Sequence, residues 1–255
     1  ILAVALAFGL CAPAAADVPA LSPLKRAFIA LEAAQARVAV LEEAAHAPIA
    51  IIGLGCRTPG GVQDADGFWR LMRDEVDAIS RVPTDRFDID ALFDADPEVP
   101  GKIATREGGF IDRPDEFDAA FFGIAPREAQ GMDPQQRLML EVAWEALEHA
   151  GQAPDRLERS ATGVYVGVTS SDYTYLQVQA GDAALYDAHF TSGIAHSVFS
   201  GRLSYLLGLQ GPSLTIDTAC SSSLVAVHLA VQSLRSGECR MALAGGVNLM
   251  LAPDI

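Results

Sequence analysis

Residues 213–224 read Ser-Leu-Thr-Ile-Asp-Thr-Ala-Cys-Ser-Ser-Ser-Leu. The first five residues, Ser213 to Asp217, include β-branched types and are expected to form a strand. The apolar positions from Leu224 to Leu234 continue at a spacing typical of a helix. Because the residues between them are small, we expect a tight turn that places Cys220 where the strand becomes the helix.

This position would favour the reactivity of the Cys220 thiol. The unpaired N–H groups and the positive dipole end of a helix N-terminus favour a thiolate over a thiol. The same donors could hold the oxygen of an acyl thioester while negative charge develops on it. Asp217 is expected to hydrogen-bond the turn, whereas His228 lies about 12 Å along the helix and is too distant to be a partner base. The alternative is a small, buried structural cysteine.

The rest of the chain alternates between strand and helix patterns. We expect a strand at 49–55, a helix at 67–77 and an irregular stretch at 83–114, followed by a long helix within 126–151 and strands at 162–168 and within 241–251. Strands separated by long helices predict an α/β fold with helices on both faces of a sheet.

The N-terminal region has two parts. Residues 1–21 form an apolar tail whose status stays open: it resembles the hydrophobic region of a secretory signal, but it lacks a basic segment and is too short to span a bilayer. Ser22 and Pro23 begin a helix over 22–47, and its apolar residues recur every three or four positions. These residues are Leu24, Ala27, Leu31, Ala34, Val38, Leu41 and Ala45. Such a seam suits either a helix packed on its own domain or a short coiled coil between two copies.

Composition narrows the possible functions. The formal net charge of -15 disfavours binding to nucleic acid or to an acidic membrane surface. The four cysteines, Cys11, Cys56, Cys220 and Cys239, form no CxxC pair, so we expect reduced thiols in a cytoplasmic protein rather than a disulfide framework or a metal site. Cys56 and Cys239 lie in apolar stretches and are expected in the core. Phosphate-loop, dinucleotide, serine-hydrolase and zinc-protease motifs are absent from the sequence.

Several motifs together resemble one family. Residues 217–224, Asp-Thr-Ala-Cys-Ser-Ser-Ser-Leu, resemble the active-site signature of the β-ketoacyl synthase domains of modular type I polyketide synthases. The segments 48–57, 132–137 and 200–205 resemble the opening strand, the central helix and the approach to the active site in the same family. The resemblance runs in register over 48–255.

The resemblance implies a thiolase-like layered αβαβα fold, of which this chain would hold the N-terminal half, preceded by a linker or docking helix. It implies a homodimer within a multidomain synthase, with no cofactor bound directly. Cys220 would accept an acyl group from the phosphopantetheine of an acyl carrier protein. A malonyl-type extender would then lose carbon dioxide and condense with that acyl group.

The sequence also departs from the family pattern. The resemblance implies two catalytic histidines in motifs that this sequence does not contain, and none of its five histidines lies in such a motif. They are His46, His149, His189, His196 and His228. We therefore expect the 255 residues to be acylated at Cys220 but not to decarboxylate malonyl groups. Two alternatives remain: a thiolase or chalcone-synthase type of enzyme that uses free coenzyme A, and a non-catalytic dimerisation or docking fragment. The sequence does not separate polyketide from fatty acid synthesis.

Overall fold

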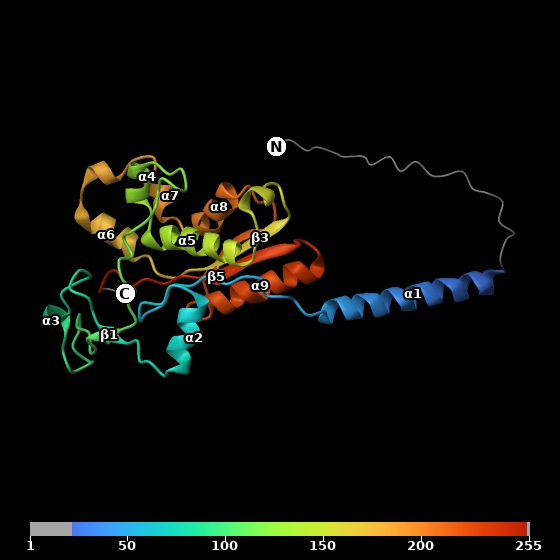
Figure 1. Cartoon of the computed structure of the whole chain (residues 1–255), viewed down its shortest axis with the longest axis horizontal. Helices are drawn as coiled ribbons and strands as arrows, with labels where there is room; N and C mark the ends of the chain where they lie inside the picture. Colours follow the sequence, from blue (N-terminus) through green and yellow to red (C-terminus); the bar gives the residue numbers. More distant parts are fainter. Residues whose placement is uncertain (1–21, 254–255) are drawn as a thin grey trace. The chain divides into compact units, whose positions relative to one another are not determined.

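The computed structural model describes residues 22–253, which divide between Ala47 and Pro48 into two units (Figure 1). The first unit is helix α1, Pro23–His46. Its N-terminus is capped by Ser22, whose Oγ accepts the Lys25 N–H at 3.3 Å. The helix expected over 22–47 is therefore present.

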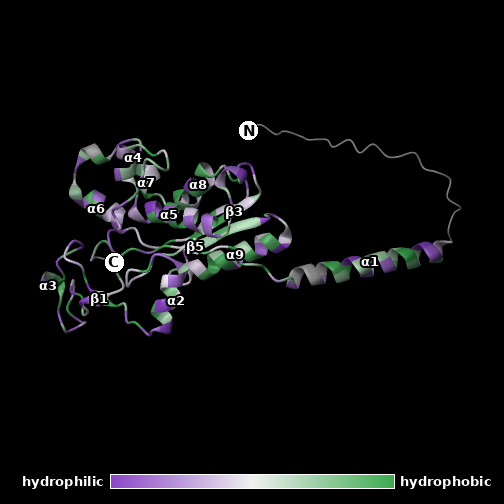
Figure 2. Ribbon diagram, in the orientation of Figure 1, coloured by the Kyte–Doolittle hydropathy of each residue, from purple (hydrophilic) through white to green (hydrophobic). Residues whose placement is uncertain are grey.

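Three large apolar residues of the α1 seam are exposed. Leu24, Leu31 and Val38 are 82%, 54% and 52% exposed. Hydrophilic and hydrophobic residues are interspersed along this helix (Figure 2). These three side chains are therefore not packed against the described residues 22–47 of their own unit.

The second unit is built on a parallel three-stranded sheet in the order β4-β3-β5. The strands are β3 (Thr162–Gly167), β4 (Ser213–Ile216) and β5 (Met241–Gly246). The central strand β3 is buried at every position, which explains why the sequence there is almost continuously apolar. Val164 is paired with Ser213 on one side and with Leu243 on the other.

Helices cover both faces of this sheet, as expected (Figure 1). Val164, Val166 and Val168 belong to one core cluster with residues of α5 (Pro134–His149) and α8 (Ser197–Leu206). Tyr165 belongs to another cluster, with Ala226 and Ala230 of α9 (Ser222–Ser236). Neighbouring residues of β3 belong to different clusters because successive side chains of a strand point to opposite faces of the sheet.

The long helix expected within 126–151 is preceded by a separate short one. Helix α4, Pro126–Gly131, ends at Met132, whose backbone is extended, and α5 begins at Pro134. Proline has no N–H and suits the first helical position. Asp133 caps α5 by accepting the Gln135 N–H at 2.8 Å, and burial raises the pKa of this carboxyl.

The prediction of a strand at 49–55 was wrong. These residues form no strand in the described part of the chain; instead they run beside α5. A Cβ added to Gly53 would lie 2.3 Å from the Ala146 carbonyl oxygen, so the glycine allows a close approach. The Leu54 N–H donates to His149 Nδ1 at 3.0 Å. The glycines therefore fit a close approach to α5, whereas the large apolar side chains of this segment stay exposed, with Ile51 81% and Leu54 54% exposed.

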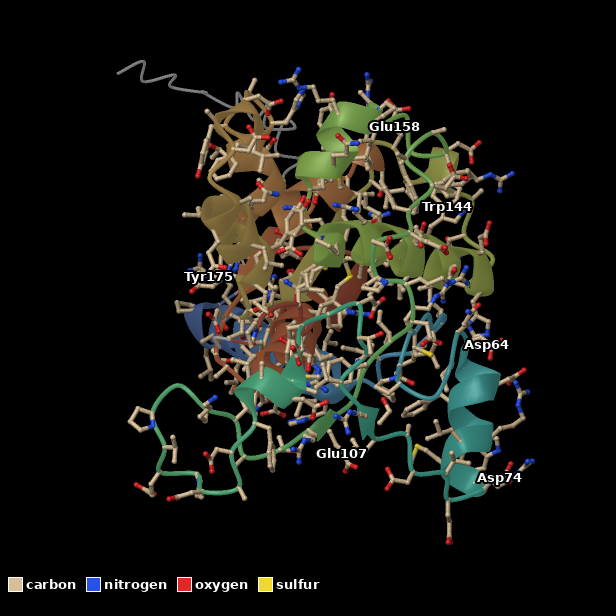
Figure 3. The ribbon with its side chains drawn as sticks, turned by 90° about the vertical axis from the view of Figure 1, so that its left-hand side faces the viewer. Asp64, Asp74, Glu107, Trp144, Glu158 and Tyr175 are labelled. Atoms are coloured by element: carbon tan, nitrogen blue, oxygen red, sulfur yellow. The ribbon has the colours of Figure 1, made fainter. Side chains whose placement is uncertain are left out.

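The expected helix at 67–77 is shifted and shorter. Helix α2 spans Ala65–Arg73, with Asp64 at its N-terminal end and Asp74 at its C-terminal end (Figure 3). The Asp64 carboxylate caps it by accepting the Gly67 N–H at 2.6 Å. The left-handed backbone of Glu75, with φ of 52°, lies just after this end.

The stretch at 83–114 is mostly irregular, as expected. It contains the single-turn helix α3, Ile89–Leu92. It also supplies strand β2, Glu107–Gly108, which pairs antiparallel with β1, Ser80–Arg81.

Between β3 and β4 lie helices that the sequence patterns did not specifically predict. They are α6 (Asp172–Ala180), α7 (Phe190–Ile194) and α8, with a 3₁₀ turn at Ala183–Leu185. Another 3₁₀ turn, Pro154–Arg156, lies before β3. Asp172 at the start of α6 is 2% exposed and accepts the N–H groups of Leu251 and Ala252 at 2.8 and 3.0 Å. Within residues 22–253, no helix has the length and apolar character needed to cross a membrane.

Candidate active site

Cys220 lies at the turn between β4 and α9. Strand β4 ends at Ile216 and α9 begins at Ser222, so five residues connect them. The Cys220 side chain is a free thiol and the residue is exposed. The structure thus has the strand-to-helix turn that the sequence predicts.

The residue before the cysteine has a strained backbone. Ala219 has φ of 55°, in the left-handed region that residues with a Cβ rarely adopt. This conformation costs roughly 1–2 kcal/mol relative to a right-handed one. Surrounding contacts must therefore hold the turn in place.

The Asp217 carboxylate supplies two of these contacts. Its Oδ1 accepts the Ala219 N–H at 3.0 Å and the Thr169 hydroxyl at 2.9 Å. These two hydrogen bonds, the backbone one first, lower the pKa of Asp217, and the charge of His196 adds a smaller effect. The expectation that Asp217 would hydrogen-bond the turn is confirmed.

Two serine hydroxyls supply further contacts. Ser222 Oγ accepts the Thr218 N–H at 2.9 Å and donates to the Ala219 carbonyl at 2.7 Å. Ser221 Oγ lies 2.8 Å from the Thr218 carbonyl oxygen, to which it donates. The polar groups on both sides of Cys220 are therefore tied to their neighbours.

Two glycines bring α9 close to the ends of the sheet strands. A Cβ on Gly167, at the end of β3, would lie 2.6 Å from the Ser222 carbonyl carbon. A Cβ on Gly246, at the end of β5, would lie 2.7 Å from the Ser223 Cβ. Only glycine permits this approach without a shift of the helix start, and with it of the turn that carries Cys220.

The Cys220 N–H is available as a donor. No described residue accepts a hydrogen bond from it. It lies two residues before α9, a helix of 15 residues whose N-terminal dipole end is directed toward the turn. A backbone donor and a thiol in one residue form the arrangement that stabilises an oxyanion during acyl transfer.

The other cysteines have different surroundings. Cys239 is 2% exposed, as expected for a core residue. Cys56 is only partly buried, and burial followed by the charge of Asp64 raises its pKa, which keeps this thiol protonated. Cys11 lies outside the described residues.

The described histidines take no part in this turn through hydrogen bonds. His228 is exposed on α9. His196 Nε2 lies 3.1 Å from Ser171 Oγ, and its ring stands edge-on to Phe199. His149 accepts a hydrogen bond from Leu54.

Thr169, Gly167 and Gly246 were not predicted as site residues. Thr169 lies just after β3, whereas Gly167 and Gly246 are the last residues of β3 and β5. All three are at the same edge of the sheet as the end of β4. The signal available from sequence is the rule that parallel strands in an α/β sheet place their carboxyl ends together, where sites form.

Comparison with known proteins agrees with this geometry. Residues 46–255 match the family described as β-ketoacyl synthase, N-terminal domain. The chain belongs to the β-ketoacyl synthase family. The motif resemblance seen in the sequence is thus confirmed.

Its curated relatives are modular polyketide synthases. The chain is 52% identical over 233 residues to a phenolphthiocerol/phthiocerol polyketide synthase of Mycobacterium tuberculosis (strain CDC 1551 / Oshkosh). It is 50% identical over 233 residues to pikromycin polyketide synthase component PikAIII of Streptomyces venezuelae. Each alignment covers 91% of this chain, but only 13% and 15% of the respective relatives. The β-ketoacyl synthase chain therefore corresponds to a small part of such proteins.

Solved structures give the same fold. The oxazolomycin ketosynthase domain OzmH KS7 of Streptomyces albus JA3453 matches with a TM-score of 0.73 and 36% identity, over 80% of this chain and 34% of that one. The ketosynthase from module 6 of the bacillaene synthase of Bacillus subtilis 168 matches with a TM-score of 0.69 and 36% identity, over 80% and 32%. The fold is thiolase-like, and the chain covers about a third of each neighbour.

Proposed function

We propose that the chain is the part of a polyketide-synthase ketosynthase that carries the acyl-accepting nucleophile, Cys220. The observation that carries this proposal is the exposed Cys220 thiol at the N-terminal end of α9, together with its unpaired backbone N–H. Thiolate character and a nearby donor are what acyl transfer to sulfur requires.

In the first half-reaction the Cys220 thiolate attacks the carbonyl carbon of an acyl thioester. A carbon–sulfur bond to Cys220 forms, and the negative charge moves onto the carbonyl oxygen, which the Cys220 N–H stabilises. The intermediate then collapses as the original carbon–sulfur bond breaks. The departing pantetheine thiolate takes up a proton, and the acyl group stays on Cys220.

In the second half-reaction the acyl group leaves Cys220. A malonyl-type thioester loses carbon dioxide, and the electron pair of the broken carbon–carbon bond attacks the acyl carbonyl. A new carbon–carbon bond forms while the bond to Cys220 breaks, which releases the thiolate and a 3-oxoacyl thioester. Cys220 thus begins and ends the cycle in the same state.

The partners follow from this chemistry. Acyl and malonyl-type groups arrive on the phosphopantetheine of an acyl carrier protein, within a homodimeric multidomain synthase in the cytoplasm. The relatives named as polyketide synthases, at 50% and 52% identity, support this setting. Helix α1 serves as a linker or docking helix ahead of the domain formed by 48–255.

A non-catalytic docking role has less support, because such a role does not need an exposed thiol on a strained and hydrogen-bonded turn. An enzyme using free coenzyme A has less support because both named curated relatives are polyketide synthases.

The test is a condensation assay on the whole encoded protein. It is supplied with an acyl-pantetheine thioester and a malonyl-loaded acyl carrier protein, and the 3-oxoacyl product is detected by mass spectrometry. Product is expected from the wild type and from Cys56→Ala but not from Cys220→Ala. Product from a folded Cys220→Ala protein at the wild-type rate would refute the proposal.

A further inference from the structure

Thr169 lies outside every motif that the sequence analysis singled out. It directly follows Val168, just beyond the end of β3, and it is 48 positions from Asp217 in the sequence. Its hydroxyl donates to Asp217 Oδ1 at 2.9 Å and lies 3.3 Å from Ser222 Oγ. Through its hydrogen bond to Asp217 it joins the end of β3 to the turn that carries Cys220.

The direction of these hydrogen bonds is fixed by their partners. A hydroxyl has one proton, and an ionised carboxylate only accepts. Asp217 is ionised at neutral pH because the ordinary pKa of its carboxyl, 3.8, is far below neutral, and the bonds from Ala219 and Thr169 lower this pKa further. The Thr169 proton therefore goes to Asp217, and the Ser222 proton goes to the Ala219 carbonyl, at 2.7 Å.

Asp217 Oδ1 is the shared acceptor of Thr169 and of the Ala219 N–H. Ala219 is the left-handed residue that sets the direction of the chain into Cys220. Thr169 is exposed and anchored by its backbone to the end of the buried strand β3, so it holds the Asp217 carboxylate at a fixed distance from the sheet. The hydrogen bonds of Thr169 and Ala219 to Asp217 thus connect the end of β3 to the residue that directly precedes the nucleophile.

We propose that Thr169 is a positioning residue for Cys220, which acts by holding Asp217 on the Ala219 N–H and so keeps the strained turn in its acyl-accepting conformation. This inference rests on the proposed function of Cys220 and adds to it a residue that lies just beyond the end of β3. In this role Thr169 acts through Asp217 rather than on the thiol or the substrate.

The test compares three threonine variants in the whole encoded protein. Thr169→Val removes the hydroxyl with nearly unchanged shape, and Thr169→Ser restores it. Thr162→Val is the matched control: it removes a hydroxyl from the other end of β3, where Thr162 Oγ1 contacts Ser160 Oγ at 2.7 Å. The rate of acylation by an acyl-pantetheine thioester is measured against substrate concentration, together with amide exchange at Ala219 by NMR.

Thr169→Val is expected to lower the maximal acylation rate about tenfold or more with little change in the half-saturating concentration, because displacement of a nucleophile by a fraction of an ångström reduces rate rather than binding. Thr169→Ser is expected to recover most of the rate, and Thr162→Val to keep it. Adding Ala219→Gly to Thr169→Val should restore part of the loss, because glycine adopts the left-handed conformation without strain. The Ala219 amide should exchange about tenfold faster in Thr169→Val, since it loses a well-held acceptor.

The outcomes distinguish a failure of the proposed function of Cys220 from a failure of the positioning role of Thr169. A wild-type protein that folds but is not acylated refutes the proposed function, and amide exchange at Ala219 then tests the role of Thr169 by itself. A Thr169→Val protein that is acylated at the wild-type rate, or a Thr169→Ser protein that is no better than Thr169→Val, overturns the positioning role. Unchanged exchange at Ala219 overturns it as well.

Discussion

At the scale of single residues, the three described cysteines differ in surroundings rather than in type. Cys220 is exposed and has an unpaired backbone N–H, Cys239 is buried, and Cys56 is partly buried with a raised pKa. The sequence predicts the role of Cys220 because a β-branched run, small residues and a helical run follow one another locally. It does not reveal Thr169, because that contact depends on how two separate strands are aligned in the sheet.

Asp217 gives a pH-dependent prediction at this scale. Its pKa is lowered from 3.8 in the folded state, so its hydrogen bonds add stability above the unfolded pKa, and this stability is lost as the pH falls through the lower folded pKa. Asp217→Asn should therefore lower the free energy of unfolding by a constant amount above about pH 5, and the difference from wild type should shrink toward about pH 2. Urea unfolding at a series of pH values measures this difference. A difference that stays constant down to the lowest pH would contradict the prediction.

At the scale of elements, the sheet and the helices α5 and α9 on its two faces were predictable from the alternation of strand and helix patterns and from apolar runs, whereas α8 was not specifically predicted. The segment 49–55 was mistaken for a strand because buried strands and extended segments that pack on a helix share a short apolar pattern. Helices α6 and α7 were missed since they are short and lack a strong apolar period. Local sequence patterns show that a segment is apolar, whereas the tertiary fold decides whether it is buried: Ile51 is 81% exposed.

The close approach of α9 to the strand ends gives a paired prediction. Gly246→Ala should lower the free energy of unfolding by about 1–3 kcal/mol, as overpacking does, because its Cβ would lie 2.7 Å from the Ser223 Cβ. It should also slow acylation of Cys220, since the helix start must move. Gly245→Ala is the control, because a Cβ there meets nothing within 4 Å. Equal loss of stability and of acylation rate in both variants would count against tight packing at this site.

At the scale of the whole molecule, the chain consists of a helical unit and an α/β unit. The α/β unit corresponds to about a third of the ketosynthase structures it matches. The heptad seam of α1 was predictable from spacing, but spacing alone does not show whether this seam packs within one chain or between two copies.

We expect the α1 seam to pair two copies of the chain. In a Cys220→Ala background, Leu31→Cys should form an intermolecular disulfide rapidly on mild oxidation, because seam residues face each other in a two-stranded coiled coil. Glu32→Cys, one position off the seam, should cross-link much more slowly. Non-reducing electrophoresis separates the species. Equal cross-linking of the two variants would show that this seam does not form the interface.

The most direct measurement is peptide mapping of the whole encoded protein after exposure to an acyl-pantetheine thioester. The mass of one acyl group is expected on the peptide that contains Cys220, with none on the peptides of Cys56 or Cys239, and Cys220→Ala should abolish it. A folded wild-type protein without an adduct on Cys220, or with the acyl group on another residue, would contradict the assignment of Cys220 as the nucleophile.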